Sequence, residues 1–165
     1  MIPQYVMEEL KGTKRYYDEH KRCVFCDILE QECREQKRII SQNEDFVCLT
    51  PFAPRYPFEC WLVPKHHSSQ FASIAEAQQL SLACLLKEVL SRIKICLSNP
   101  SYNFFLHISP INDEGKESYH WHMEVIPRLT QFSGFEWGSG FNVVRTSPEV
   151  AAQYLREVAW SVKTA

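Results

Sequence analysis

The sequence predicts an α+β domain with a mainly antiparallel sheet of about five strands, one long helix, and a helix near each end of the chain. Short apolar segments bounded by turn residues predict the strands, and they cluster around a single long helix. That helix, residues 74–97, keeps helical spacing of its apolar side chains. The chain has 165 residues, of which 45% are hydrophobic, so it is long enough for one domain with its own core.

Helical patterns occur at four places. The best is residues 74–97, which Asn99-Pro100 ends. Ser147 and Pro148 begin a C-terminal helix, because serine is a preferred N-cap and proline fits the first helical position. The other two predicted helices are residues 4–19 and a short segment that runs from the cysteines at 23–26 to about Arg34.

The predicted strands are short and rich in apolar residues. A proline-rich turn, residues 51–57, separates two of them, and a polar loop, residues 112–118, joins the last two. A stretch in which glycines are interspersed with aromatic residues, 134–144, follows the last strand and is assigned to no element. The strands are predicted at residues 38–41, 46–50, 59–63, 102–108 and 119–126.

Composition and charge exclude several classes of function. The formal net charge is −2 and the isoelectric point is about 6.3, so we expect no nucleic-acid partner and no membrane association. No segment approaches the roughly 20 apolar residues of a membrane helix, and residues 1–20 lack the apolar core of a secretory signal. We therefore expect a cytoplasmic protein. The seven cysteines are an odd number and most lie in apolar segments, which predicts buried thiols rather than a disulfide scaffold.

The strand predicted at 119–126 carries the strongest functional signal. Alternate residues of a strand share a face, so His120, His122 and Glu124 project together, while Trp121 and Met123 face the other way. Three titratable groups on a buried strand are costly unless they bind a metal or act on a substrate. The alternative is a polar row that faces solvent beside a packed face.

The pair Cys23-x-x-Cys26 is the second signal. It does not lie in the βαβ context of a thioredoxin-type redox motif, so a closed tetrahedral zinc site is the better interpretation. Such a site needs two further ligands, and imidazole is suitable. His107 lies in an apolar strand, where a histidine is more often a hydrogen-bonded core residue than a ligand. The candidate ligands are His66, His67, His120 and His122, with His20 as a substitute.

Two arrangements are open for His120 and His122. Histidines at positions i and i+2 of a strand share a face and can chelate one metal together. Alternatively, one of them binds zinc while the other stays available as a nucleophile. The spacing alone does not separate these arrangements.

Three motifs together resemble the histidine-triad superfamily of nucleotide hydrolases and transferases: CVFCDILE, LVPKHH and YHWHMEVIPR. GFEWGSGFNVV and SPEVAAQYLREV are similar to the carboxyl-terminal half of the galactose-1-phosphate uridylyltransferase-like branch, which includes ADP-glucose phosphorylases. The resemblance covers roughly residues 10–160. It implies a histidine-triad-like fold, with residues 1–165 as a single domain and 1–22 as an N-terminal helical extension.

The resemblance also implies roles for individual residues. Zinc is expected at Cys23, Cys26, His67 and His120. His122 corresponds to the family's nucleophile, which attacks the α-phosphate of a nucleotide-sugar or dinucleotide. Three residues are expected at the substrate: Asn103, which matches a phosphate-contacting position, Ser118, which adds a hydroxyl, and Glu124, which stands third in the H-x-H-x-H pattern.

Glu124 in place of a third histidine is typical of carboxyl-terminal halves, in which the two histidines support a metal or the fold. In the family, two such folds work together as halves of one chain or as two subunits. The first hypothesis is therefore a homodimeric nucleotidyltransferase or hydrolase. The second is a non-catalytic zinc- and nucleotide-binding module. A third is a structural subunit that completes another protein's active site.

Overall fold

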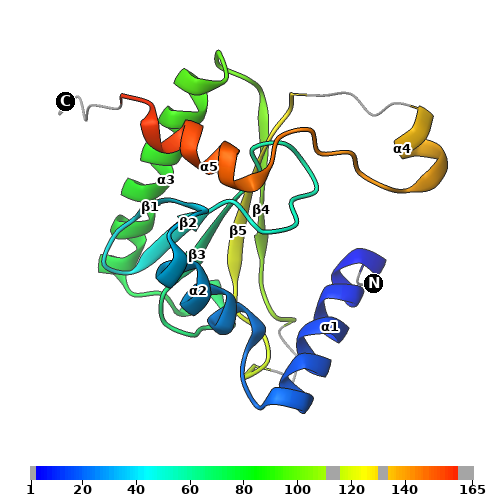
Figure 1. Cartoon of the computed structure of the whole chain (residues 1–165). Coiled ribbons are helices and arrows are strands. Elements are labelled where there is room, and N and C mark those ends of the chain that lie inside the picture. Colours follow the sequence, from blue (N-terminus) through cyan, green and yellow to red (C-terminus); the bar gives the residue numbers. More distant parts are fainter. Residues whose placement is uncertain (1–2, 111–115, 130–133, 160–165) are drawn as a thin grey trace.

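A five-stranded antiparallel sheet is the centre of the computed structural model, which describes residues 3–110, 116–129 and 134–159. The spatial order of the strands is β1-β2-β3-β5-β4, and each neighbouring pair is antiparallel. Strands β1 and β4 are therefore the two edges of the sheet (Figure 1). The strands are β1 (Ile39–Gln42), β2 (Phe46–Leu49), β3 (Cys60–Pro64), β4 (Tyr102–His107) and β5 (His122–Pro127).

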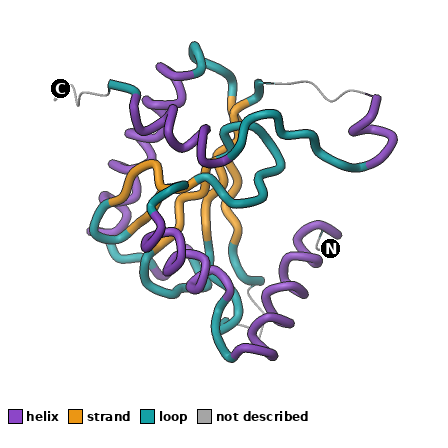
Figure 2. The backbone as a smooth tube through the Cα atoms, viewed as in Figure 1, coloured by secondary structure: helices purple, strands orange, loops and turns teal. Residues whose placement is uncertain are grey.

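Helices lie against both faces of this sheet (Figure 2). α3 and α5 pack on one face and build the larger core with strand residues such as Phe46 and Leu62. α2 packs on the opposite face, where Leu29 joins a smaller core with Val47 and Val63. Within the described residues, no helix is both long and apolar enough to cross a membrane. The helices are α1 (Gln4–His20), α2 (Val24–Glu35), α3 (Glu76–Cys96), α4 (Gly134–Ser139) and α5 (Pro148–Glu157), with a 3-10 turn at Phe71–Ser73.

Alternation along β5 decides which side chains reach each face. Met123 and Val125 enter the core under α3, whereas His120, His122 and Glu124 point to the face that α2 covers. The predicted row of three titratable side chains on one face is confirmed. The row is buried, with His120, His122 and Glu124 at most 2% exposed, so it is not a solvent-facing polar row.

The predicted α+β class and the antiparallel sheet are confirmed, and each predicted helix and strand is present with ends shifted by at most a few residues. The largest shift is at β5, which begins at His122 rather than at 119. Just before it, the Trp121 N–H donates to the Ser68 carbonyl in the segment after β3. Ser147 caps α5 as predicted, because its hydroxyl accepts from the Val150 N–H.

The structure adds one helix that the sequence did not predict. α4 forms inside the glycine and aromatic stretch and lies apart from the sheet in Figure 1. Two glycines in a six-residue segment lower its helix propensity, so the pattern gave no helical signal. Its large side chains do not join the core: Phe135 is 60% exposed and Trp137 is 79% exposed.

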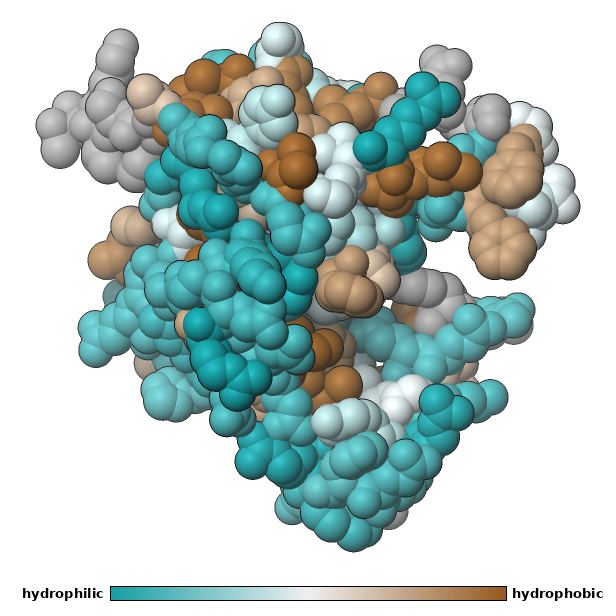
Figure 3. All heavy atoms as spheres, in the orientation of Figure 1, coloured by the Kyte–Doolittle hydropathy of each residue, from teal (hydrophilic) through white to brown (hydrophobic). Residues whose placement is uncertain are grey.

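α1 is attached to the rest of the chain mainly through polar contacts. Thr13 is its one buried residue among those whose burial is described. The Tyr16 hydroxyl donates to Asp27, and the Tyr17 hydroxyl donates to Glu117. Figure 3 shows a largely hydrophilic surface over this helix. α1 therefore depends on specific hydrogen bonds rather than on a large apolar contact.

Candidate functional site

His120, just before β5, and His122, its first residue, enter two separate clusters on the face of the sheet that α2 covers. We call the first the thiol cluster: Cys23, Cys26, His67 and His120, whose ligand atoms lie within 4.8 Å of one another. We call the second the carboxylate cluster: Glu9, His107 and His122, which meet the same criterion, together with Glu124, which lies 3.4 Å from His107. The two histidines of the H-x-H strand therefore face different partners.

Three segments bring the thiol cluster together. Cys23 is the N-cap of α2 and Cys26 lies in its first turn, so both sulfurs are at the amino end of the helix. His67 follows β3, and His120 lies two residues before the start of β5. The amino end of a helix carries a partial positive charge, which favours thiolates.

The spacing inside the thiol cluster fits a tetrahedral metal. The Cys26 Sγ atom lies 3.4 Å from His67 Nδ1 and 3.5 Å from His120 Nδ1. Zinc bonds of about 2.3 Å to sulfur and about 2.0 Å to nitrogen place tetrahedral ligand atoms roughly 3.5 Å apart. The other ring nitrogen of His67, Nε2, donates to the Lys116 carbonyl at 3.2 Å, a contact that typically orients a metal-binding imidazole.

The ionisation of the thiol cluster also suits a metal. Hydrogen bonds from the Cys26 thiol and from the His120 and His67 rings hold the pKa of Cys23 far below its ordinary value. The hydrogen bond to the Cys23 thiolate in turn raises the pKa of His67. Metal binding requires deprotonated sulfur, and this arrangement favours that form.

The carboxylate cluster joins α1, β4 and β5. His107 lies directly opposite His122 in the β4–β5 pairing, and their rings stack with centroids 4.6 Å apart. His107 Nδ1 donates to a Glu9 oxygen at 3.0 Å, and its Nε2 lies 3.4 Å from Glu124. The other Glu9 oxygen accepts from the Tyr119 hydroxyl at 2.8 Å. His107 is thus held between two carboxylates.

The two stacked imidazoles have different ionisation. Burial opposes charge on His107, but its hydrogen bonds to Glu124 and Glu9 outweigh burial and raise its pKa to about 9. Burial lowers the pKa of His122 to about 4. At neutral pH His107 is therefore charged and His122 is neutral. Neighbouring groups whose pKa values are pushed apart are typical of functional sites.

The proton of neutral His122 is on Nδ1. This atom lies 3.2 Å from the His120 carbonyl oxygen, which can only accept, so Nδ1 must donate. The lone pair is then on Nε2, which lies 3.9 Å from a Glu9 oxygen and 4.0 Å from a Glu124 oxygen. Nε2 is therefore the atom of His122 that can attack an electrophile or bind a metal.

Arg55 and Glu59 extend the carboxylate cluster. The Arg55 guanidinium donates to Glu124, so Glu124 has two cationic neighbours, Arg55 and His107. Glu59 accepts from the backbone N–H of Arg55 and from the Trp61 indole. Burial, with the nearby charge of Glu124, raises the pKa of Glu59. The positive charges of Arg55 and His107 therefore balance most of the negative charge of Glu9 and Glu124 beside His122.

Two adjoining cavities lie on this side of the sheet. The first, about 290 Å³, is lined by His122, Glu9, Glu124 and Arg55 among others. The second, about 460 Å³, shares Ala53 and Trp61 with the first and has Ile28, Arg38, Pro51 and Phe52 in its walls. Arg38 is buried there against Glu32, with its guanidinium 5.2 Å from the centre of the Phe52 ring. Aromatic and aliphatic walls suit a planar ring system, and the first cavity has several charged side chains in its walls.

Not every predicted residue lies in these cavities. Asn103 is exposed on β4 opposite Ile126, four residues from His107, which is roughly 13 Å along the strand. It is His107 that faces His122. Ser118 is buried two residues before His120 and lines neither cavity.

Glu9 is a site residue that the sequence did not predict, and His107 was expected only as a core residue. His107 is hydrogen-bonded, as predicted, but it belongs to the carboxylate cluster. The pairing of β4 with β5 is the signal that would have identified it. Glu9 carries no such signal, because α1 reaches the sheet from almost a hundred residues away in the sequence.

Comparisons with known proteins identify the family of this chain. A family model described as the C-terminal domain of galactose-1-phosphate uridyl transferase matches residues 9–160. ADP-glucose phosphorylase of Arabidopsis thaliana is 36% identical over 161 residues, which are 96% of this chain and 44% of that protein. A crystal structure of an Arabidopsis thaliana ADP-glucose phosphorylase with bound ADP-glucose superposes with a TM-score of 0.87 at 36% identity, covering 97% of this chain and 51% of that chain.

A more distant structure supports the fold. A zinc-bound histidine triad family protein from Mycobacterium smegmatis is 18% identical and superposes with a TM-score of 0.56, covering 81% of this chain and 90% of that one. The predicted histidine-triad-like fold is confirmed. The chain spans about half the length of the curated relatives it matches.

Proposed function

Because the chain belongs to the family of galactose-1-phosphate uridyl transferase C-terminal domains, we propose that it is one histidine-triad-like unit of a nucleotidyltransferase that acts on a nucleotide-sugar. Residues 1–165 form one domain in this proposal, with 1–22 as a helical extension, and its location is cytoplasmic. The working unit in this proposal is a homodimer, in which two histidine-triad-like units act together; the chain itself spans about half the length of the matched relatives.

Zinc in the thiol cluster is the proposed cofactor. Two sulfurs and two imidazole nitrogens are a common ligand set for structural zinc, and the sulfur-to-nitrogen distances of 3.4 and 3.5 Å support it. The zinc-bound relative is a further reason to test this metal first. Such an ion would tie α2 to the sheet, and its role is structural because protein side chains fill all four positions.

The nucleotide occupies the two adjoining cavities in this proposal. Its base lies between Trp61 and Phe52, whose rings offer apolar faces. Its phosphates point toward His122 in the smaller cavity, where Arg55 supplies positive charge. Asn103 and Ser118 stay predictions as phosphate contacts; Asn103 lies opposite Ile126 on β4, and Ser118 is buried in the segment before β5.

His122 is the proposed nucleophile, and the protonation of its ring is the observation that carries this proposal. The Nε2 lone pair forms a bond to the α-phosphorus while the bond from that phosphorus to the bridging oxygen breaks. The sugar phosphate leaves with that electron pair. An acceptor oxygen then attacks the same phosphorus and returns His122 to the neutral state. The His122 imidazole is neutral and its Nδ1–H donates a hydrogen bond to the His120 carbonyl, so the Nε2 lone pair is already free to attack.

One observation favours a second candidate, the non-catalytic module. His122 is 1% exposed, and two carboxylates lie within 4.0 Å of Nε2. Carboxylates and imidazoles around one point also suit a cation, and a lone pair that binds a cation cannot attack phosphorus. In that case the domain binds zinc and nucleotide-sugar while chemistry occurs elsewhere.

Intact-mass measurement separates the two candidates. The protein is incubated with ADP-glucose, UDP-glucose or diadenosine tetraphosphate, and metal content is measured in parallel. An acid-labile nucleotidyl adduct that His122→Ala abolishes and His66→Ala keeps would support the nucleophile, since His66 is exposed. Binding of nucleotide-sugar by calorimetry without any adduct would establish the non-catalytic candidate. Turnover by His122→Ala at the wild-type rate would contradict the assigned role.

A further inference from the structure

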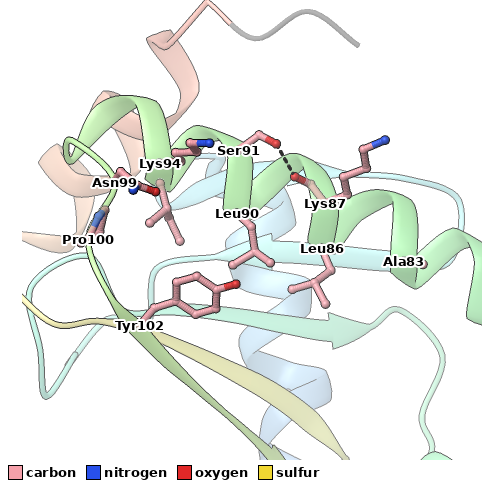
Figure 4. Close-up of a pocket in the computed structure, with 10 residues that line it drawn as sticks. Ala83, Leu86, Lys87, Leu90, Ser91, Lys94, Asn99, Pro100 and Tyr102 are labelled. Carbon is pink, nitrogen blue, oxygen red and sulfur yellow. Dashed lines mark hydrogen bonds between the residues drawn. The ribbon is translucent and has the colours of Figure 1, made fainter. Parts of the chain in front are cut away.

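α1 contributes to one of three cavities. A cavity of about 470 Å³ lies between α3 and β4, where Leu86 and Leu90 reach toward the Tyr102 ring (Figure 4). The cavity of about 460 Å³ beside Arg38 contains no residue of α1 either. Only the cavity of about 290 Å³ at His122 has residues of α1 in its wall. A displacement of α1 would therefore change the proposed phosphate site and leave the other two cavities intact.

The contribution of α1 to that cavity is a pair of acidic residues. Glu8 and Glu9 line the cavity. Glu9 Oε1 lies 3.9 Å from His122 Nε2, and Glu9 Oε2 accepts from His107 at 3.0 Å. The position of α1 therefore determines both the wall of the cavity and the charge beside His122.

Little apolar contact holds α1 in this position. Thr13 is its one buried residue among those whose burial is described. Gly12, in the interior of the helix, lowers its helix propensity. A helix of 17 residues depends mainly on tertiary contacts for its stability. Side-chain hydrogen bonds to the rest of the chain must therefore keep α1 in place.

Two consecutive tyrosines make these hydrogen bonds. The Tyr16 hydroxyl donates to Asp27 at 2.9 Å, and the Tyr17 hydroxyl donates to Glu117 at 2.6 Å. We call Asp27 and Glu117 the anchor residues. Consecutive residues of a helix point about 100° apart around its axis. The two hydroxyls therefore hold α1 from two directions and oppose its rotation.

Both anchor residues are next to segments of the thiol cluster. Asp27 directly follows Cys26 in the first turn of α2. Glu117 directly follows Lys116, whose carbonyl accepts from His67 Nε2 at 3.2 Å. Cys26 and His67 belong to the thiol cluster. A metal ion in that cluster would therefore join the two segments that carry the anchor residues.

The segment between α1 and α2 is short and is bound to the same aspartate. Residues 21–23 join the two helices. Lys21 has a φ of 57°, in the left-handed region, and so reverses the direction of the chain. Arg22 Nε donates to Asp27 Oδ1 at 2.6 Å, while the other oxygen of Asp27 accepts from Tyr16. A displacement of the amino end of α2 would therefore be transmitted to α1.

We propose that Tyr16 and Tyr17 are positioning residues that hold α1, and with it Glu9, at the carboxylate cluster, and that this hold depends on metal binding to the thiol cluster. Without a metal, contacts of 3.4 and 3.5 Å from Cys26 to two imidazoles are the sulfur-to-nitrogen contacts that join the segments. The anchor residues then separate more easily, and α1 leaves the cavity. The inference rests on the zinc site of the proposed function and goes beyond it by coupling the two clusters.

His107 reports the position of α1. Glu9 comes to this imidazole from α1, whereas Glu124 comes from β5 and stays when α1 moves. Departure of α1 would therefore remove one of two carboxylates and lower the pKa of His107 from about 9. Glu9→Gln shows the pKa to expect when the Glu9 charge is absent.

The first test is NMR titration of the histidine rings in zinc-loaded protein. Tyr16→Phe with Tyr17→Phe keeps both rings and removes both hydroxyls. This double variant and Glu9→Gln should each lower the pKa of His107 by about one pH unit. Glu9→Gln added to the double variant should lower it no further, because both changes act through the same carboxylate. The control, Tyr154→Phe, removes an exposed hydroxyl of α5 and should change nothing. An unchanged pKa in the double variant would overturn the positioning role.

Trypsin digestion tests the dependence on metal. Lys11, Lys14 and Arg15 are exposed on α1, and trypsin cleaves after such residues where the helix opens. Removal of zinc with a chelator should raise the cleavage rate at these sites at least about tenfold, and restored zinc should reverse the change. The zinc-loaded double variant should also be cleaved faster than wild type. Zinc-free protein that is cleaved at the zinc-loaded rate would overturn the dependence on metal.

Metal analysis and calorimetry with ADP-glucose separate this inference from the proposed function. A protein may bind zinc and ADP-glucose while the double variant leaves both the His107 pKa and the cleavage rate unchanged. That result refutes the coupling alone. The expected responses in a protein that binds zinc but neither binds ADP-glucose nor forms an adduct refute the proposed nucleotide chemistry alone.

Discussion

The thiol cluster and the carboxylate cluster share one strand and differ in chemistry. His120 and His122 are two residues apart and project from the same face of the sheet, yet one faces two cysteines and the other faces two glutamates. The difference comes from the neighbours: α2 brings sulfur to His120, and α1 with β4 brings charge to His122. An H-x-H pattern on a strand therefore determines only that both histidine side chains lie on the same face of the sheet. The segments that pack against that face determine the role of each histidine.

The clusters also differ in what holds them together. The thiol cluster contains weak sulfur-to-nitrogen contacts of 3.4 and 3.5 Å, so a metal would supply most of its binding energy. The carboxylate cluster is held by its own charges, with Glu9 and Glu124 on either side of His107. We therefore expect metal binding to the thiol cluster to control folding of the amino-terminal segment. We expect the stability that the carboxylate cluster contributes to depend on pH.

The largest expected effect is the loss of a sulfur from the thiol cluster. Cys23→Ser should remove bound zinc and lower the free energy of unfolding by about 4 kcal/mol or more, because metal-binding energy is folding energy. Urea unfolding with metal analysis measures both quantities. The control is Cys84→Ser, which changes an exposed thiol on α3 and should keep both zinc and stability. A zinc-free Cys23→Ser protein of wild-type stability would contradict the role of the cluster.

A second prediction tests the separation of the two histidines directly. Cobalt bound to thiolates gives intense absorption, and His120→Ala should weaken cobalt binding at least about 100-fold because it removes a ligand. His122→Ala should leave the thiolate bands unchanged, since its ring lies in the other cluster. Titration of each variant with cobalt, followed by absorbance, makes the measurement. Equal losses in both variants would mean that the two histidines share one metal.

Removal of the Glu124 charge tests the charge balance of the carboxylate cluster. Glu124→Gln leaves His107 with Glu9 alone, so the pKa of His107 should fall and the free energy of unfolding should decrease by about 3 kcal/mol. NMR titration of the histidine rings reports the pKa. Glu19→Gln, at an exposed position of α1, is the control and should change neither value. An unchanged pKa of His107 would show that Glu124 does not stabilise its charge.

The smallest expected effect is a pH dependence in buffers without added divalent metal. The charge on His107, with its pKa raised to about 9, stabilises the fold fully below pH 6.5, and this contribution is lost as pH rises through 9. His122, with its pKa lowered to about 4, acts in the opposite direction, and stability falls as pH drops from 6.5 toward 4. Stability should therefore be greatest near pH 6.5, about 1 kcal/mol lower at pH 5 and about 2 kcal/mol lower at pH 9.

Urea unfolding at pH 5, 6.5 and 9 measures this profile. Glu124→Gln provides the internal comparison, because a lower pKa of His107 should flatten the alkaline side while leaving the acid side in place. Stability that rises steadily from pH 6.5 to 9 in wild type would contradict the assigned charge on His107.

The local features of the fold could be predicted because each depends on neighbours in the sequence. Ser147 and Pro148 start α5 through contacts within one helical turn. The α3 helix was predicted from the spacing of its apolar residues. α4 was missed because its glycines oppose helix formation locally. Asn103 lies four positions from His107 along β4, opposite Ile126, so its phosphate contact stays a prediction.

The sequence by itself determined the α+β class, the direction of His120, His122 and Glu124, and the presence of a sulfur pair at 23–26. These follow from the periods of strands and helices, which are properties of the backbone. Only the tertiary structure decided that His120 joins the cysteines while His122 joins Glu9 and His107. Those partners lie far away in the sequence, and packing of whole elements brings them within hydrogen-bonding distance. Local sequence patterns do not predict contacts between such distant residues. The placement of His120 in one cluster and His122 in the other is therefore a property of the folded chain.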